Sequence, residues 1–135
     1  MNDILRVGVI GTGVMGRDHA RLLATEISGA RLTAIADVNL DGAREVAERH
    51  GVEAVFSDGS ELMASGLVDA VVIASPDHLH AGTTLAAIDA GLAVLCEKPL
   101  APTVEEAEEV AARHASLERP LVSVGFMRRF DPGYV

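Results

Sequence analysis

Short apolar runs alternate with segments of helical periodicity along almost the whole sequence, and this rhythm limits the chain to few folds. The runs barely alternate with polar residues, as expected of parallel strands that are covered on both faces. They cover residues 4–10, 32–36, 54–56, 70–74, 92–96 and 121–124. The alternation predicts an α/β domain with a doubly wound, mostly parallel sheet and right-handed crossovers. A flavodoxin-like domain would show the same rhythm, so the site residues must decide the function.

The segments between the runs carry recognisable helix ends. Apolar residues recur at helical spacing over 41–50, and Gly51 follows directly, as glycine commonly does just past a helix. Thr103 and Glu106 match a capping box at the start of a second helix. Three further helices are expected: one over 60–65 before Gly66, one over 79–90 before Gly91, and one after residue 16 that carries Ala20, Leu22, Leu23 and Ile27.

A glycine-rich loop stands between the first strand-like run and the first helical segment. Its pattern is G-x-G-x-x-G, which in this context is typical of a dinucleotide-binding turn. Gly11 would allow the tight turn, Gly13 would let the backbone approach a pyrophosphate, and Gly16 would let the helix pack closely. The alternative is a purely structural glycine turn. The loop residues expected to bind the cofactor are Gly11, Thr12, Gly13, Val14, Met15 and Gly16.

Asp37 follows the second run, 21 positions after Gly16, where an acidic residue accepts hydrogen bonds from the adenosine ribose. Its charge would repel a 2′-phosphate about 4 Å away by about 1 kcal/mol in water and about 4 kcal/mol at an intermediate dielectric. Neither Val38 nor Asn39 offers a positive charge in compensation. We therefore expect NAD rather than NADP as the cofactor, with Val38 beside it; the alternative for Asp37 is a capping aspartate.

Unusual residues follow the later runs, at the sheet edge where doubly wound folds bind ligands. Residues 75–80 read Ser-Pro-Asp-His-Leu-His, residues 96–101 read Cys-Glu-Lys-Pro-Leu-Ala, and residues 124–134 read Val-Gly-Phe-Met-Arg-Arg-Phe-Asp-Pro-Gly-Tyr. Together with the glycine loop, these segments resemble the N-terminal half of the Gfo/Idh/MocA oxidoreductases. The resemblance spans essentially the whole chain, and its last segment is most similar to the inositol 2-dehydrogenases of that family.

The resemblance implies a Rossmann domain followed by a second α/β domain that supplies much of the substrate pocket and the oligomer interface. Residues 1–125 would then form the core of the dinucleotide-binding domain, and residues 126–135 would begin the connection to the second domain. The family's usual proton acceptor is a histidine in that second domain, paired with an aspartate, and neither lies among these 135 residues.

Lys98 matches the family's lysine, which contacts the reacting hydroxyl or carbonyl. A free lysine is protonated at neutral pH and is a poor base, so we expect Lys98 to orient the oxygen and stabilise its developing negative charge. The alternative is a solvated loop lysine. Whether the Lys98–Pro99 bond is cis, as the resemblance suggests, is open at the level of sequence.

The resemblance also assigns residues around Lys98. Ser75 and Pro76 would lie under the nicotinamide side, and His80 is expected in the cofactor site. Glu97 would face a cofactor ribose or cap backbone. The family positions that line the substrate or nicotinamide end are matched by Met127 and Arg128, although Arg128 in an interdomain salt bridge is the alternative.

Other polar and aromatic residues receive structural interpretations. His19 is expected to pack or cap within the first helix, and His78 to lie in a loop or first helical turn. Phe126 and Phe130 are expected in the core. No pair of histidines has acidic or cysteine neighbours at metal-binding spacing, so no metal site is predicted.

Charge and cysteine content narrow the partners. Twenty acidic residues against eleven basic ones give a net charge of −9, which argues against nucleic acid and anionic membranes. The single cysteine, Cys96, and the lack of a secretory signal or a long apolar run favour the cytoplasm. A homo-oligomer, dimer or tetramer, is expected from the resemblance.

The leading hypothesis is the cofactor domain of an NAD-dependent dehydrogenase that acts on a cyclic polyol or sugar, with inositol favoured. A family member acting on an aldose, a dihydrodiol or a sugar-nucleotide is one alternative. A non-catalytic NAD-binding sensor or partner module is the other.

Overall fold

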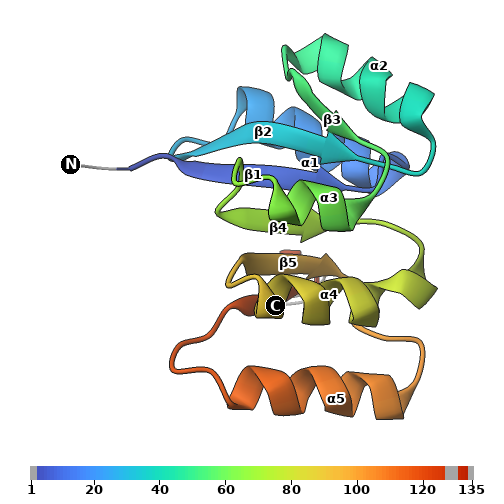
Figure 1. Cartoon of the computed structure of the whole chain (residues 1–135), viewed down its shortest axis with the longest axis vertical. Helices are drawn as coiled ribbons and strands as arrows, with labels where there is room; N and C mark the ends of the chain where they lie inside the picture. The colour runs from blue at the N-terminus through green and yellow to red at the C-terminus, as the bar shows by residue number, and fades with distance from the viewer. Residues whose placement is uncertain (1–2, 127–130, 134–135) are drawn as a thin grey trace.

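A parallel sheet forms the centre of the protein. The computed structural model describes residues 3–126 and 131–133, and within them six strands run in the order β3-β2-β1-β4-β5-β6 (Figure 1). The strands are β1 (Leu5–Ile10), β2 (Ala30–Ala36), β3 (Ala54–Phe56), β4 (Ala70–Ile73), β5 (Ala93–Glu97) and β6 (Val122–Gly125). The strand order reverses between β1 and β4, and such a switch point is where doubly wound sheets bind ligands.

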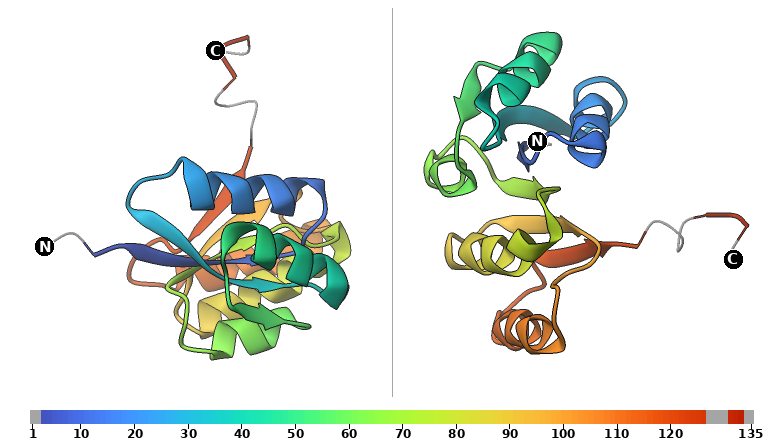
Figure 2. Two further views of the ribbon diagram at one scale, coloured as in Figure 1. Left: turned by 90° about the horizontal axis from the view of Figure 1, so that it is seen from above. Right: turned by 90° about the vertical axis from the view of Figure 1, so that its right-hand side faces the viewer.

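Helices cover both faces of the sheet, with α1 and α4 on opposite sides (Figure 2). On one face α1 and α2 pack over Val9 and Ile35, and on the other α3 and α4 pack over Ile73 and Cys96. All four of these strand residues are completely buried. The helices are α1 (Val14–Thr25), α2 (Leu40–His50), α3 (Gly59–Ala64), α4 (His80–Asp89) and α5 (Val104–Ala115), with a short 3-10 turn η1 (Asp77–Leu79) before α4.

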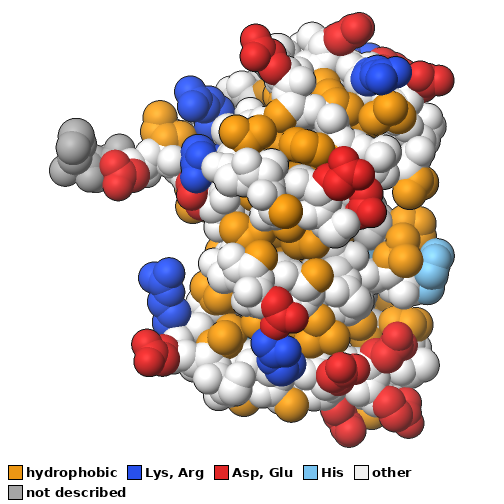
Figure 3. Space-filling view, in the orientation of Figure 1, with side chains coloured by type: hydrophobic (Ala, Val, Ile, Leu, Met, Phe, Trp, Pro, Cys, Tyr) orange, Lys and Arg blue, Asp and Glu red, His pale blue; other side chains and the backbone are white. Residues whose placement is uncertain are grey.

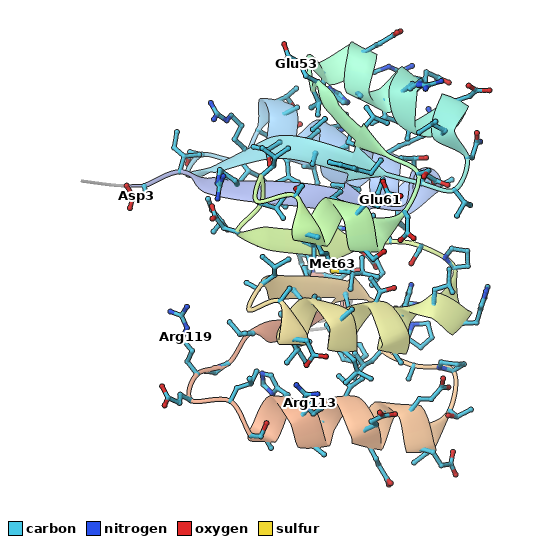
Figure 4. All side chains as sticks on the ribbon, viewed as in Figure 1. Asp3, Glu53, Glu61, Met63, Arg113 and Arg119 are labelled. Atoms are coloured by element: carbon cyan, nitrogen blue, oxygen red, sulfur yellow. The ribbon has the colours of Figure 1, made fainter. Side chains whose placement is uncertain are left out.

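Side chains join the outer helix α5 to the domain and cap its start. Arg113 of α5 forms an ion pair with Asp89 at the end of α4, and Figure 4 shows Arg113 on the side of α5 that faces α4. Thr103 accepts a hydrogen bond from the Glu106 backbone N–H, so the predicted cap is confirmed. Acidic side chains gather over one part of the outer surface of α5, at the lower right of Figure 3. No helix in the described part of the chain is long and apolar enough to cross a membrane.

The predicted elements are confirmed with two corrections. α1 ends at Thr25, so Ile27 lies beyond the helix and 46% of its surface is exposed. The chain there is already turning toward β2 through Gly29, whose φ is +84°. Phe126 was predicted in the core but is 57% exposed, because it directly follows the last residue of the edge strand β6. Phe130 lies outside the described residues.

Candidate functional site

The three loop glycines meet very different surroundings. A Cβ on Gly11, whose φ is +101°, would lie 2.5 Å from the Ala74 carbonyl, and a Cβ on Gly16 would lie 1.8 Å from the Gly11 oxygen. Both distances are far below van der Waals contact, so these two positions require glycine. A Cβ on Gly13 would meet no described atom within 4 Å. Only Gly13 therefore has open space beside it, of the kind that an approaching ligand could fill.

The start of α1 leaves its first N–H groups available. Gly13 is the N-cap residue, and within the described residues α1 has neither a side-chain cap nor an acidic residue in its first turn. The first N–H groups of a helix have no partner inside the helix, and the positive end of the helix dipole lies there. Such an end favours an anion, phosphate in particular.

Asp37 is held in place by the glycine loop. Its Oδ2 accepts hydrogen bonds from the Thr12 backbone N–H and hydroxyl, both at 2.7 Å, and its Oδ1 accepts one from the Asn39 N–H at 2.8 Å. Partial burial raises the pKa of Asp37, but these hydrogen bonds outweigh it, and the net pKa lies below the ordinary value. Asp37 is therefore a carboxylate at neutral pH. The cap of α2 is Asn39 rather than Asp37.

A cleft of about 410 Å³ opens beside Asp37 at the carboxyl edge of the sheet. Gly11 and Ser75 lie at the switch point, Val38 lies next to Asp37 with 89% of its surface exposed, and Met63 is a largely buried wall residue. Figure 4 shows Met63 on the side of α3 that faces the sheet. The remaining lining comes from the ends of β1 and β2, from the β3–α3 loop and the start of α3, and from the segment after β4 through η1 into α4. Its surface is mostly apolar, and the residues are Ile10, Ala36, Ser57, Asp58, Gly59, Ser60, Pro76, Leu79, Gly82, Thr83 and Ala86.

A second hollow of about 300 Å³ is also lined by Ser75. Ser75 borders both hollows, so they are neighbours at the carboxyl edge of the sheet. Its hydroxyl oxygen is buried and has no hydrogen-bond partner among the described residues, and a buried polar atom of this kind needs a partner. The second hollow is lined by Gly13, Val14, Met15, Ala74, Ser75, Asp77, His80, Glu97 and Lys98.

Lys98 is exposed and lines the second hollow. It is the only lysine in the sequence, since the other ten basic residues are arginines. The Lys98–Pro99 peptide bond, left open by the sequence, is cis. Burial raises the pKa of the neighbouring Cys96 thiol, so this cysteine is a core residue rather than a nucleophile.

Glu97 contacts a residue that sequence reasoning placed elsewhere. Its Oε1 lies 2.5 Å from Nε2 of His19, and both side chains are mostly buried. The interpretation of His19 as packing or capping within α1 is therefore wrong, because its ring reaches across to the end of β5. The two residues are 78 positions apart, and no local sequence signal points to such a pair.

The two remaining predicted histidine positions differ sharply. His78 is exposed in η1, which confirms its interpretation as a residue of a loop or first helical turn, whereas only 1% of His80 is exposed at the start of α4. Met127 and Arg128, the predicted substrate-contacting residues, lie outside the described residues. Within 3–126 and 131–133, no group of three or more His, Cys, Asp or Glu side chains is placed to hold a metal ion.

The strand order, the glycine loop and the cleft at the switch point define a dinucleotide-binding domain. The family model described as "Oxidoreductase family, NAD-binding Rossmann fold" matches residues 5–126. The chain therefore belongs to this family, Gfo/Idh/MocA, and is its NAD-binding domain.

Several proteins similar to this chain are named inositol dehydrogenases. Inositol 2-dehydrogenase 2 of Paenarthrobacter aurescens is 52% identical over 135 residues, covering 97% of this chain and 40% of that protein. Inositol 2-dehydrogenase 1 of Saccharopolyspora erythraea is 48% identical over 132 residues, covering 97% and 39%. The crystal structure of Lactobacillus casei myo-inositol dehydrogenase with NAD(H) and myo-inositol superposes with a TM-score of 0.91 at 35% identity, covering 96% and 39%. The chain thus spans about two fifths of the length of these proteins.

Proposed function

We propose that this chain is the cofactor domain of an NAD-dependent dehydrogenase that oxidises a secondary alcohol of a cyclic polyol, with inositol as the favoured substrate. One observation carries the proposal: the two hollows that share Ser75 are lined by the Asp37 carboxylate, by the uncapped start of α1 and by Lys98. The similar proteins named inositol 2-dehydrogenase support the choice of substrate.

The chain's own groups in these two hollows fit NAD. Asp37 is positioned to accept hydrogen bonds from the adenosine ribose, and the largely apolar first hollow suits adenine. Gly13 offers the open space that a pyrophosphate needs, and Ser75 has a buried hydroxyl in want of a partner. The proposed residues of the cofactor site are Gly11, Thr12, Gly13, Val14, Met15, Gly16, Asp37, Val38, Ser75, Pro76, His80, Glu97 and Lys98.

The chemistry assigned to this domain is electrostatic. NAD⁺, when bound, accepts the hydride that leaves the substrate carbon. Lys98 donates a hydrogen bond to the substrate oxygen and stabilises the negative charge that develops as its proton leaves. The proton acceptor is proposed to be a histidine of a second domain, as the family resemblance implies, with Met127 and Arg128 contributing to the substrate site.

Cofactor titration tests the binding half of the proposal. Calorimetry on this chain is expected to show NAD binding that is tighter than NADP binding, because the Asp37 carboxylate repels a 2′-phosphate. Asp37→Ser is the matched variant, and the ratio of its NAD affinity to its NADP affinity should be smaller than in the unmutated chain. Binding of neither cofactor, or tighter binding of NADP, would contradict the assignment of Asp37.

Because Lys98 is the single lysine of the sequence, its proposed role in catalysis can be tested directly. An amine-reactive reagent should modify Lys98 in the free chain and modify it more slowly with NAD bound, while the α-amino group serves as the internal reference. In a full-length enzyme, Lys98→Ala should lower kcat by about a hundredfold or more, the size of a lost oxyanion donor, and change NAD affinity only a few-fold. An unchanged kcat would remove Lys98 from the mechanism.

The assembly of the whole protein belongs to the same proposal. Residues 1–125 are proposed as the cofactor domain core and 126–135 as the start of a connection to a substrate domain. A homo-oligomer is expected from the family resemblance, and the cytoplasm is favoured because the single cysteine is buried and cannot form an internal disulfide.

A further inference from the structure

His80 joins the two loops that carry the proposed site. Its Nε2 lies 2.7 Å from the Ser75 carbonyl oxygen, in the loop after β4, and its Nδ1 lies 2.6 Å from the Pro99 carbonyl oxygen, in the loop after β5. The ring is buried, with 1% of the residue exposed. His80 thus connects the loop at the centre of the cleft to the loop that holds Lys98.

Both contacts need a donor on the ring. Carbonyl oxygens only accept hydrogen bonds, and a neutral imidazole has one N–H donor and one acceptor nitrogen. A neutral His80 would set the lone pairs of one nitrogen against those of a carbonyl oxygen at these distances. The imidazolium has two N–H donors and satisfies both carbonyls.

The surrounding charges can support a cation at this position. The charged groups that line the same hollow as His80 are Asp77, Glu97 and Lys98, which together carry one net negative charge. The dipole of α4 opposes a cation, because His80 is the first residue of that helix. Glu97 also pairs with His19 of α1, so the direct partners of the His80 ring are the Ser75 and Pro99 carbonyl oxygens.

We propose that His80 is a positioning residue. As an imidazolium it binds the Ser75 loop and the Lys98 loop together, and it thereby fixes the position of the second hollow relative to the first. The functional part of this inference rests on the proposed NAD site. The protonation state of the ring does not, so the two can be tested separately.

Nitrogen-15 NMR on the histidine-labelled chain tests the ring itself. With His80 assigned by through-bond correlation to its own backbone, both ring nitrogens should appear protonated near pH 7.5, with N–H protons that exchange slowly with water. Exposed His78 is the internal reference for a ring open to solvent. A neutral tautomer at His80, with one nitrogen unprotonated, would overturn the proposal even if NAD binds as expected.

NAD titration tests the positioning role. His80→Gln should bind NAD roughly tenfold more weakly, about the effect of one lost hydrogen bond to a charged group. Thr84→Val is the matched control, since Thr84 is also fully buried on α4 and should leave NAD affinity within twofold. In the unmutated chain, NAD affinity should fall with rising pH in step with loss of the second ring proton. The positioning role would be overturned if His80→Gln bound NAD as tightly as the unmutated chain. It would also be overturned if the NAD affinity of the unmutated chain stayed constant while the ring deprotonated. If the unmutated chain did not bind NAD at all, the proposed function would be overturned instead.

Discussion

Two helices of equal length, α1 and α5, begin in opposite ways. α5 starts with the Thr103 cap and has Glu105 and Glu106 in its first turn. α1 starts at Gly13 and, as far as the described residues show, has no side-chain cap and no acid in its first turn. The start of α5 is satisfied by its own side chains, whereas α1 keeps its N–H groups and its dipole for a ligand. A helix that lacks the usual stabilising cap is thus a useful indicator of an anion site when it borders a cleft.

The largest effect is expected where α1 meets its own loop. Gly16→Ala puts a Cβ 1.8 Å from the Gly11 oxygen, so the backbone must move. Ordinary overpacking lowers the free energy of unfolding by about 1–3 kcal/mol, and the loss in Gly16→Ala should be larger. Thermal unfolding would measure it. Gly82→Ala is the control, because a Cβ at this position in the first turn of α4 meets no described atom within 4 Å, and the change should stabilise the protein by at most roughly 0.5–1 kcal/mol. Equal stability of the two variants would refute the assigned packing.

Gly13→Ala separates ligand binding from folding. Its backbone, with φ −73°, suits any residue, and the added Cβ meets open space in the free protein. The melting temperature should therefore stay close to that of the unmutated chain. The free energy of NAD binding should become less favourable by about 1–3 kcal/mol, since the methyl group occupies space assigned to the pyrophosphate. Calorimetry gives the affinity, and full affinity in this variant would place the phosphates elsewhere.

Val14→Glu gives the start of α1 the acidic character of α5. Val14 is 85% exposed, so the change should fit, and the new carboxylate should stabilise the helix by about 0.3–1 kcal/mol through the dipole. Repulsion of the phosphates should weaken NAD binding by about 1–4 kcal/mol. The isosteric Val14→Gln controls for size. A more stable protein with weaker NAD binding is the expected pair of results; if Val14→Glu bound NAD as tightly as Val14→Gln, the start of α1 would lie away from the phosphates.

Asp37 gives a pH-dependent effect at the other side of the loop. Its pKa is lowered in the folded state, so its stabilising effect is complete above the ordinary carboxyl pKa of about 3.9 and is lost as the pH falls through the folded value. Asp37→Asn should lower the free energy of unfolding by about 1–3 kcal/mol at pH 7. The difference in stability between this variant and the unmutated chain should disappear at acidic pH. Urea midpoints at several pH values measure this. Asp41→Asn removes the same charge from a side chain that is 97% exposed, and there a comparable pH-dependent gap would argue against a specific role for Asp37.

The smallest effect is expected at the start of α5. Thr103→Ala removes the cap hydrogen bond to the Glu106 N–H and should destabilise the protein by about 1 kcal/mol. NAD affinity should not change, because α5 does not line either hollow. Thr103→Ser restores the cap and should recover most of the stability. A change in NAD affinity would show that the two helix starts are coupled.

Local patterns predicted much of this molecule because they reflect local constraints. The apolar runs, the capping residues and the glycines act through neighbours within a few positions, so the strands, most helix ends and the glycine loop could be read directly. Ile27 was misplaced because it fits the helical spacing of the first helix, and Phe126 because its aromatic ring was taken as a core residue. Each lies just past the end of an element.

Within the candidate site, the residue types were predictable and their partners were not. The sequence indicated Asp37 and His80, but their contacts depend on how strand ends and loops meet. Thr12 reaches Asp37 across 25 positions, and His80 reaches Pro99 across 19. Long-range pairs of this kind leave no periodic signal in one sequence.

By itself, the sequence determined a doubly wound domain with a dinucleotide loop, an acid after the second strand and a lysine after the fifth, because periodicity, caps and motif spacing are properties of neighbouring residues. Only the tertiary structure decided that Gly13 alone among the loop glycines faces open space, that His19 pairs with Glu97, and that both nitrogens of His80 face carbonyl oxygens. Those features arise where separate crossovers bring the ends of β1, β4 and β5 to one edge of the sheet, and packing in three dimensions sets the distances there.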